Sequence, residues 1–243
     1  MTIKNKNKSA FTLIEILIAM AIFSFALVLV TGIFSSVLGN QTLISTSSEV
    51  SRENQRIMRQ ISDDAIGATK TGRVVKLNGS SNPVEGFLFI DENMKIIDSA
   101  RLCKTYPGAV FDELDEEGPT ISCTLANGLV LFSDQGIKIY RFSPFSGSEF
   151  GDIEYAFAAG VSDLSVSNSN SITTNFSFKK LNSDDTEVRK LKFWGFGCYL
   201  NSCELHPFAQ IYLGMQTKDY NKLSANKRFA FGLKTRISKR SYN

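Results

Sequence analysis

Residues 11–38 read FTLIEILIAMAIFSFALVLVTGIFSSVL, an apolar run with a single ionisable side chain, Glu15. A hydrocarbon core of ~30 Å needs about 20 helical residues, so this run is long enough to cross a bilayer. The ten residues before it are polar and include three lysines, and no proline follows until Pro83. The sequence therefore predicts a membrane helix that follows a short basic leader.

The carboxylate of Glu15 is unusual in this setting. A charged side chain near the bilayer centre costs roughly 2.5–3.5 kcal/mol on insertion scales and less near the interface, so an acid inside a membrane helix is a functional candidate. Glu15 is the fifth residue of the run. We expect it to need a partner.

The segment around the start of the run carries a family resemblance. In residues 9–15, SAFTLIE, a small residue separates the basic leader from an aromatic residue, and Glu15 follows four residues later. This closely resembles the processing site of type IV prepilins and type II secretion pseudopilins. The resemblance implies that prepilin peptidase cuts between Ala10 and Phe11 on the cytoplasmic side and that the new amine of Phe11 is N-methylated.

The same resemblance gives Glu15 a role in assembly. It implies that the carboxylate faces the cationic amine of a neighbouring subunit's Phe11 inside a filament. A buried ion pair of this kind is weak evidence of net stability but can fix register, here the stagger between subunits. The chain departs from the family at Ala10, where glycine is nearly always found, and this departure bears on the rate of cleavage more than on its position.

Three other readings of the run are weaker. A secretory signal has an apolar core of roughly 7–15 residues followed by an A-x-A-like site, which is shorter than this run. A plain signal-anchor accounts for the length and the basic flank but not for Glu15. A buried helix of a soluble protein is the third alternative.

Composition fits one membrane element plus one globular domain of about 170 residues, since the 243 residues are 43% hydrophobic and 21% charged. The formal net charge of +3 equals the contribution of the leader lysines Lys4, Lys6 and Lys8. Lysines before a first span keep that end in the cytoplasm. We therefore expect a single-pass inner-membrane protein with its C-terminal domain outside the cytoplasm, and the resemblance implies a later place in a periplasmic or cell-surface filament.

Four regions follow from these patterns: a leader at 1–10, a transmembrane or filament-core helix at 11–39, an amphipathic helix half at 40–68 and a globular β domain at 69–243. In the helix half, apolar residues recur at helical spacing. The predicted apolar stripe comprises Val50, Ile57, Met58, Ile61, Ala65 and Ile66. The predicted solvent side comprises Glu49, Arg52, Glu53, Arg56, Arg59, Asp63 and Asp64.

From Arg73 onward, strand signals dominate, with Gly67 as a helix stop, Thr71-Gly72 as a turn and residues 134–136 as a hairpin turn. We expect an α+β fold in which the long N-terminal helix packs on an antiparallel β-sheet, a pilin-like arrangement by the resemblance. The predicted strands are Val74–Leu77, Gly86–Ile90, Thr120–Leu125, Leu129–Phe132, Ile137–Phe142, Ile153–Phe157, Leu164–Val166, Ile172–Lys179, Val188–Phe193 and Phe229–Ile237.

Cys103, Cys123, Cys198 and Cys203 all lie in the exported part. An even number of cysteines outside the cytoplasm favours disulfides, and three pairings exist. The pairs Cys103–Cys123 and Cys198–Cys203 are preferred because each is close in sequence. A zinc site would need histidines nearby, and His206 is the only one.

The order of strand signals from residue 160 to the C-terminus looks like the J-type minor pseudopilins and W-type minor pilins. This resemblance implies a structural subunit at the tip or initiation complex of a type IV pilus or a type II secretion pseudopilus. Its implied partners are prepilin peptidase, other major and minor pilins or pseudopilins and the inner-membrane assembly platform. No cofactor is implied, and no motif of an enzyme active site is found.

A competing function is binding of DNA or another ligand, as in a DNA-uptake or adhesive pilin. The candidate residues are Lys227, Arg228, Lys234 and Arg236, in a C-terminal stretch with Tyr220, Phe229 and Phe231 interleaved among its basic residues. The simpler explanation is that the aromatics are strand core and the charges face solvent. An acidic run at 112–118 is a calcium candidate, but its spacing does not match an EF-hand loop and such runs are usually solvated.

Overall fold

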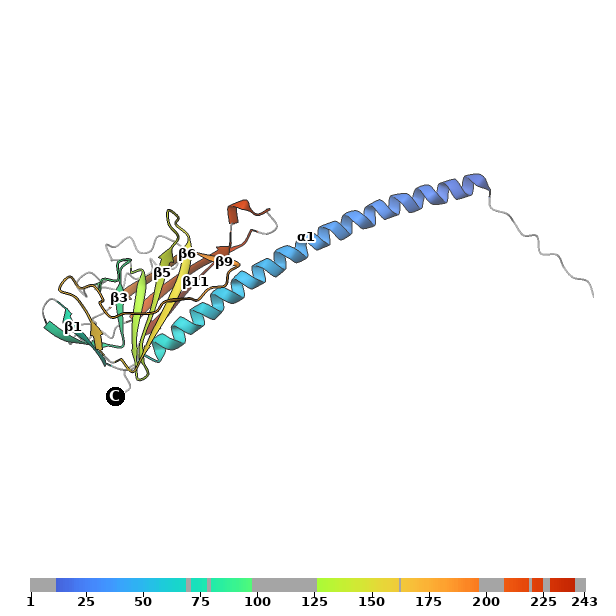
Figure 1. Ribbon diagram of the computed structural model, residues 1–243. Helices are drawn as coiled ribbons and strands as arrows, with labels where there is room; N and C mark the ends of the chain where they lie inside the picture. The colour runs from blue at the N-terminus through green and yellow to red at the C-terminus, as the bar shows by residue number, and fades with distance from the viewer. Residues whose placement is uncertain are drawn as a thin grey trace, which may run out of the picture. The chain divides into compact units, whose positions relative to one another are not determined.

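The computed structural model describes residues 12–68, 71–77, 80–97, 126–161, 163–196, 208–218, 220–224 and 228–238. Contacts divide the chain into two units, residues 1–45 and 46–243. The elements of Figure 1 are α1 (Leu13–Ile66), β1 (Thr71–Leu77), β2 (Ser80–Glu85), β3 (Phe87–Ile90), β4 (Gly128–Ser133), β5 (Gly136–Pro144), β6 (Gly151–Ala159), β7 (Asp163–Ser165), β8 (Lys179–Lys180), β9 (Thr186–Phe196), β10 (Phe208–Thr217), η3 (Tyr220–Lys222) and β11 (Ala230–Ser238).

One helix, α1, runs from the apolar segment into the amphipathic segment, which confirms the prediction of a long N-terminal helix. It ends at the predicted stop, where the amide of Gly67 donates to the carbonyl of Asp63 at 2.9 Å. Thr71-Gly72, predicted as a turn, instead begins β1, because these residues pair with Glu85 and Val84 of β2.

In the second unit, α1 packs on a large antiparallel sheet and closes the main core. Five of the six predicted stripe residues are buried: Val50, Ile57, Met58, Ile61 and Ala65. The prediction was wrong for Ile66, whose side chain is 65% exposed. One residue turns the helix by about 100°, so the position after Ala65 points away from the sheet.

The large sheet has the strand order β11-β10-β9-β6-β5-β4-β3, with β8 paired to β6. Every neighbouring pair in it is antiparallel, as predicted. The turn at 134–136 joins β4 to β5 as expected, with Ser133 opposite Gly136. Strand β10 was not predicted, although Ile211, Leu213 and Met215 are buried at the two-residue period of a strand.

Strands β3, β4 and β5 are apolar on both faces because each face meets a separate core. Phe87, Leu129 and Tyr140 belong to the core against α1. Leu88, Val130 and Ile139 belong to a second core that includes Leu164 of β7 and Val166. This explains why all four residues of β3 are buried.

A small second sheet departs from the predicted all-antiparallel arrangement. Its order is β2-β1-β7, and β1 pairs with β7 in parallel. Strand β2 was not predicted. It contains Pro83, which lacks a backbone N–H. The position suits proline, since β2 is the edge of this sheet and pairs only with β1.

The predicted strand Ile172–Lys179 does not form. Ile172 makes an isolated bridge with Val166, and only Lys179 and Lys180 form β8. The two-residue pattern still shows in burial, because Phe176 and Phe178 pack against the second core while Ser177 is exposed. The amides of Ile172 and Thr173 donate to the carbonyls of Met94 and Ser165, but this backbone pairing does not continue along the segment as a strand. The predicted strand Thr120–Leu125 lies outside the described residues.

Candidate functional site

Thr12 lies directly before α1, and Glu15 lies in the first turn of that helix. The amide and hydroxyl of Thr12 each lie 3.4 Å from Oε2 of Glu15, and the amide of Glu15 donates to the carbonyl of Thr12 at 3.0 Å. A glutamate that reaches back to the residue before the helix is half of a capping box, and a negative charge here also suits the helix dipole. Among the described residues, no cation contacts this exposed carboxylate. Ala10 and Phe11, the predicted cleavage and methylation residues, lie outside that part of the chain.

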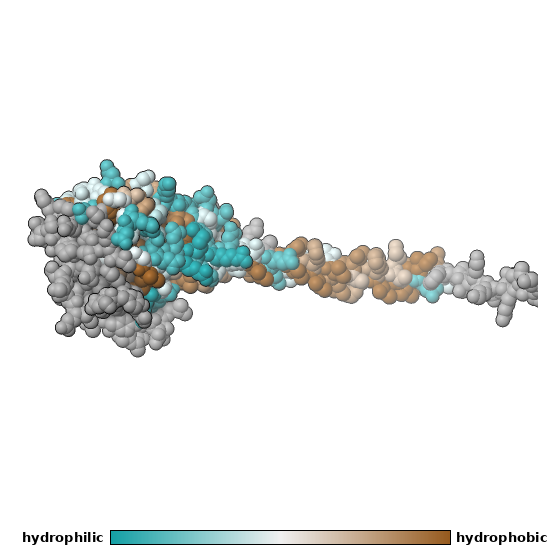
Figure 2. Space-filling view, turned by 90° about the horizontal axis from the view of Figure 1, so that it is seen from below, coloured by the Kyte–Doolittle hydropathy of each residue, from teal (hydrophilic) through white to brown (hydrophobic). Residues whose placement is uncertain are grey.

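The part of α1 in the first unit exposes its apolar side chains all round. It contains a segment long and apolar enough to cross a membrane, and none of that segment is buried. Figure 2 shows this as a brown surface on the helix. Two hydroxyls within it are satisfied internally, since Ser24 donates to Met20 O and Thr31 to Leu27 O, each at 2.8 Å. In an apolar environment there is no water to bond polar groups, so hydrogen bonds within the helix, such as these two, suit that setting.

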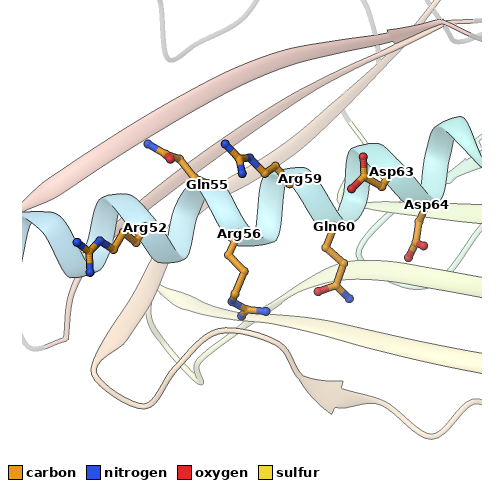
Figure 3. A pocket seen from close by; sticks show the side chains of 7 residues that line it. All are labelled: Arg52, Gln55, Arg56, Arg59, Gln60, Asp63 and Asp64. Atoms are coloured by element: carbon orange, nitrogen blue, oxygen red, sulfur yellow. The ribbon is translucent and has the colours of Figure 1, made fainter.

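In the second unit, one face of α1 carries a line of exposed charges, here named the charged stripe: Glu49, Arg52, Arg56, Arg59 and Asp63. Their spacing of three and four residues places them on one helix face, opposite the buried stripe. Figure 3 shows this region, a shallow groove of about 630 Å³. Of the residues that the structure describes, those that line the groove all come from α1: Arg52, Gln55, Arg56, Arg59, Gln60, Asp63 and Asp64.

Arg56 is the anchored member of the charged stripe. Its guanidinium donates twice to Glu53, each time at 2.8 Å, and once to the carbonyl of Leu181 at 2.7 Å. Glu53 also accepts from the amide of Ser183 at 3.1 Å. The hydrogen bond from Arg56 lowers the pKa of Glu53 below its ordinary value. By contrast, Arg52, Arg59 and Asp63 form no ion pair with any described residue.

The C-terminal cations predicted to bind ligand separate into two places. Lys234 and Arg236 lie on the exposed side of β11. Arg228 lies before that strand, where Nε donates to Leu223 O at 2.8 Å and the guanidinium is 5.9 Å from the centre of the Tyr220 ring. Lys227 falls outside the described residues.

Sheet register adds cations that the sequence analysis missed. Lys234 lies opposite Tyr212 of β10, which in turn lies opposite Lys192 of β9, so these three residues form one row across the strands. Lys190 is in the next row, opposite Gly214. Lys190, Lys192, Lys234 and Arg236 are here named the basic sheet face. Because β10 was not predicted, the predicted strands contained no link between β9 and β11.

Several polar groups on this face are partly or fully buried. Lys192 donates to Oδ1 of Asn127 at 2.7 Å, and burial together with Lys190 lowers the pKa of Lys192. In the row of Arg236, both amide atoms of Gln210 and the indole N–H of Trp194 are buried without a hydrogen-bond partner in the described structure.

The remaining candidates lie outside the described residues: Cys103, Cys123, Cys198, Cys203, His206 and the acidic run at 112–118. In the part of the chain that the structure describes, no three cysteine, histidine or acidic side chains gather as metal ligands would.

Comparison with known families identifies the N-terminal region. Residues 5–31 match the prokaryotic N-terminal methylation motif, a match that supports a type IV prepilin-like protein. This range contains the leader lysines Lys6 and Lys8, the predicted cleavage point and Glu15. No curated protein and no solved structure matches the chain.

Proposed function

We propose that this type IV prepilin-like protein is a minor pilin or pseudopilin, a structural subunit at the tip or initiation complex of a type IV pilus or type II secretion pseudopilus. The observation that carries the proposal is the methylation motif at residues 5–31, which continues directly into an exposed apolar helix. Prepilin peptidase removes residues 1–10, Phe11 becomes the methylated N-terminus, and the C-terminal domain lies outside the cytoplasm.

Assembly then consists of helix packing. The apolar side chains of α1 are exposed in the single chain, so neighbouring helices can cover them in a filament. The Glu15 carboxylate contacts no described cation, which suits a partner on another subunit. The amine of that subunit's Phe11 would supply the charge and set the stagger.

The second unit supports a minor role. It holds a large sheet, a second sheet and two separate cores, an elaborate domain for a subunit that repeats along a shaft. A bulky domain is easier to accommodate at a filament tip, because fewer neighbouring subunits surround it there than in the shaft. The J-type and W-type resemblance points the same way.

Intact-mass spectrometry of the full chain from membranes tests the proposal. In a host with prepilin peptidase, the mature chain should begin at a methylated Phe11, whereas a peptidase-deficient host should keep residues 1–10. An Ala10→Gly variant should be cut at the same bond and faster. A leader retained in the host with peptidase refutes the proposal. Spectra before and after reduction also report whether the four cysteines are paired.

A second candidate function is the binding of an anionic ligand such as DNA, supported by the basic sheet face and the buried amide of Gln210 beside it. A gel-shift with the full chain in detergent at two salt concentrations tests it, since phosphate contacts weaken steeply with salt. Lys234→Glu with Arg236→Glu should lower affinity and flatten the salt dependence. Lys95→Glu with Lys179→Glu, exposed lysines elsewhere, is the matched control. Equal binding by both variants would exclude this face.

A further inference from the structure

The charged stripe of α1 has a symmetric order of charges. Along the helix it reads negative, positive, positive, positive, negative at Glu49, Arg52, Arg56, Arg59 and Asp63. All five residues are exposed, although Arg56 reaches the carbonyl of Leu181 and Glu49 borders a cavity that Asp185 and Lys218 also line. Apart from Arg56, none of them hydrogen-bonds or pairs with the rest of the described chain, so four exposed charges remain for an outside partner.

We propose that the charged stripe is a contact surface for the same stripe of a second copy of this chain, packed parallel to it and displaced along the helix axis. The inference rests on the proposed function in one respect. Two copies anchored in one membrane through the same N-terminal helix present their α1 helices in the same direction.

The order of charges disfavours contact without displacement. Two parallel stripes in register place arginine beside arginine and acid beside acid, and like charges between adjacent helices are destabilising. An antiparallel pair centred on Arg56 fails equally, because Glu49 then meets Asp63 and Arg52 meets Arg59. Both symmetric arrangements are therefore repelled.

A displacement of ten to eleven residues reverses the sign of the interaction. Glu49 of one copy then lies level with Arg59 of the other, and Arg52 lies level with Asp63. No like charges of the charged stripe meet at this offset, which is about 15–17 Å along the helix axis. An offset of seven residues also makes two attractive pairs, but it places Arg52 beside Arg59. The charges therefore favour the larger stagger.

Arg56 occupies the centre of the stripe and does not take part in the contact. Its guanidinium is held by Glu53 and Leu181 of its own chain. At the favoured offset it meets no charged stripe residue of the other copy. Electrostatic complementarity of this kind sets register and partner choice more than affinity. Between parallel helices, Glu15 lies level with a neighbour's Phe11 at an offset of four residues, about 6 Å, so the copy that meets the charged stripe at the larger offset is a different neighbour from the one whose amine meets Glu15.

A charge-exchange experiment on the full chain tests the proposal. Two differently tagged copies are co-expressed in a host with prepilin peptidase, and recovery of one with the other is measured from mild detergent. The acidic variant carries Arg52→Glu and Arg59→Glu; the basic variant carries Glu49→Lys and Asp63→Lys. Each variant with itself should be recovered about tenfold less than the parent pair, because two weak pairs become repulsive. The mixed pair of acidic and basic variants should restore recovery.

Two controls separate contact from folding and general charge effects. Lys95→Glu with Lys179→Glu makes the same change of net charge as the acidic variant elsewhere on the surface and should leave recovery unchanged. Trp194 fluorescence should show that each variant stays folded, since exposed substitutions rarely unfold a domain. Salt at 1 M, where the screening length is ~3 Å, should reduce the difference between mixed and like pairs.

The mixed pair decides the outcome. Recovery no better than with like pairs overturns the inference, as does recovery of the parent chain only with a different subunit. The intact mass of the same preparations distinguishes the two proposals. If the chains are processed but the mixed pair is not recovered better than the like pairs, the self-contact is refuted and the proposed function stands. If the chains retain the leader, the proposed function itself is refuted.

Discussion

Nζ of Lys138 on β5 lies 2.6 Å from Oδ1 of Asp64 in α1, a contact that joins the last turns of the helix to the large sheet. The other oxygen of Asp64 accepts a hydrogen bond from the hydroxyl of Tyr140, which also accepts from Gln60 at 3.4 Å. Burial, aided by the Asp64 hydrogen bond, raises the pKa of Tyr140, so this hydroxyl remains a donor at neutral pH.

Removal of the Asp64 carboxylate should therefore destabilise the second unit. Asp64→Ala leaves Lys138 and Tyr140 without their shared acceptor, and we expect a loss of about 2 kcal/mol in the free energy of unfolding. Trp194, the only tryptophan, lies in this unit, so urea unfolding of the full chain in detergent can be followed by its fluorescence. Asp63→Ala, one residue away and exposed, should change stability by less than ~0.5 kcal/mol. Equal losses in the free energy of unfolding for the two variants would contradict a stabilising role of the contacts made by Asp64.

The Glu53–Arg56 pair should make stability depend on acid pH. The pKa of Glu53 is lowered in the folded chain from an ordinary value of 4.5. Its stabilising contribution is therefore complete above pH 4.5 and is lost as pH falls through the lowered pKa. We expect about 1 kcal/mol at pH 7, since solvent screens the 49% exposed side chain of Arg56.

Glu53→Gln should remove that part of the acid sensitivity. The difference in unfolding free energy between the parent and the variant should be largest at pH 7 and shrink toward about pH 3. Urea unfolding of both chains at several pH values measures it. A difference that stays constant with pH would show that proton binding at Glu53 has no part in stability.

Gly136 should be intolerant of any side chain. It has a φ of 140°, and a Cβ there would lie 2.1 Å from the carbonyl oxygen of Ala158 in β6. Gly136→Ala combines backbone strain with a clash, so we expect about 2–4 kcal/mol of destabilisation. Gly147→Ala is the matched control, with φ at 73° and open space around it, and should cost about 1–2 kcal/mol. Similar unfolding midpoints for the two variants would disprove the predicted clash.

Glu15→Ala should leave membrane insertion intact and impair assembly. Insertion depends on the apolar run, whereas the carboxylate is proposed to pair with a neighbouring Phe11 amine. Thr12→Val is the control, because it removes the hydroxyl that contacts Glu15 but keeps the charge. Membrane fractionation measures insertion, and counts of filaments, or of associated subunits, measure assembly. Unchanged counts for Glu15→Ala, or an equal loss for Thr12→Val, would count against the assigned role.

The predictions made from the sequence were confirmed where they depended on residues close together in the chain. The long helix, its stop at Gly67, the buried stripe and the hairpin before Gly136 all depend on spacing within a few residues. The error at Ile66 came from the end of such a pattern, whereas at Ile172–Lys179 the alternation of apolar residues is present but the strand does not form. There, the choice between core and solvent, or between strand and extended loop, depends on which partner is close.

Asn54 shows the same limit inside the helix. It is fully buried, and its Nδ2 donates to the carbonyls of Leu213 at 3.2 Å and Phe231 at 3.0 Å. A polar residue among the stripe positions would ordinarily be placed at the surface. The acceptors lie on two strands more than 150 residues away, and the spacing of residues along the helix does not predict them.

The sequence by itself determined the membrane-competent helix, its methylation motif and the α+β class, because hydropathy, charge order and periodicity are properties of adjacent residues. Only the tertiary structure decided that Lys192, Tyr212 and Lys234 form one row, that β1 and β7 pair in parallel, and that the residues of the charged stripe are exposed. Those facts depend on backbone pairing and on packing between residues far apart in the chain, where the free energy of burial and hydrogen bonding selects the partner.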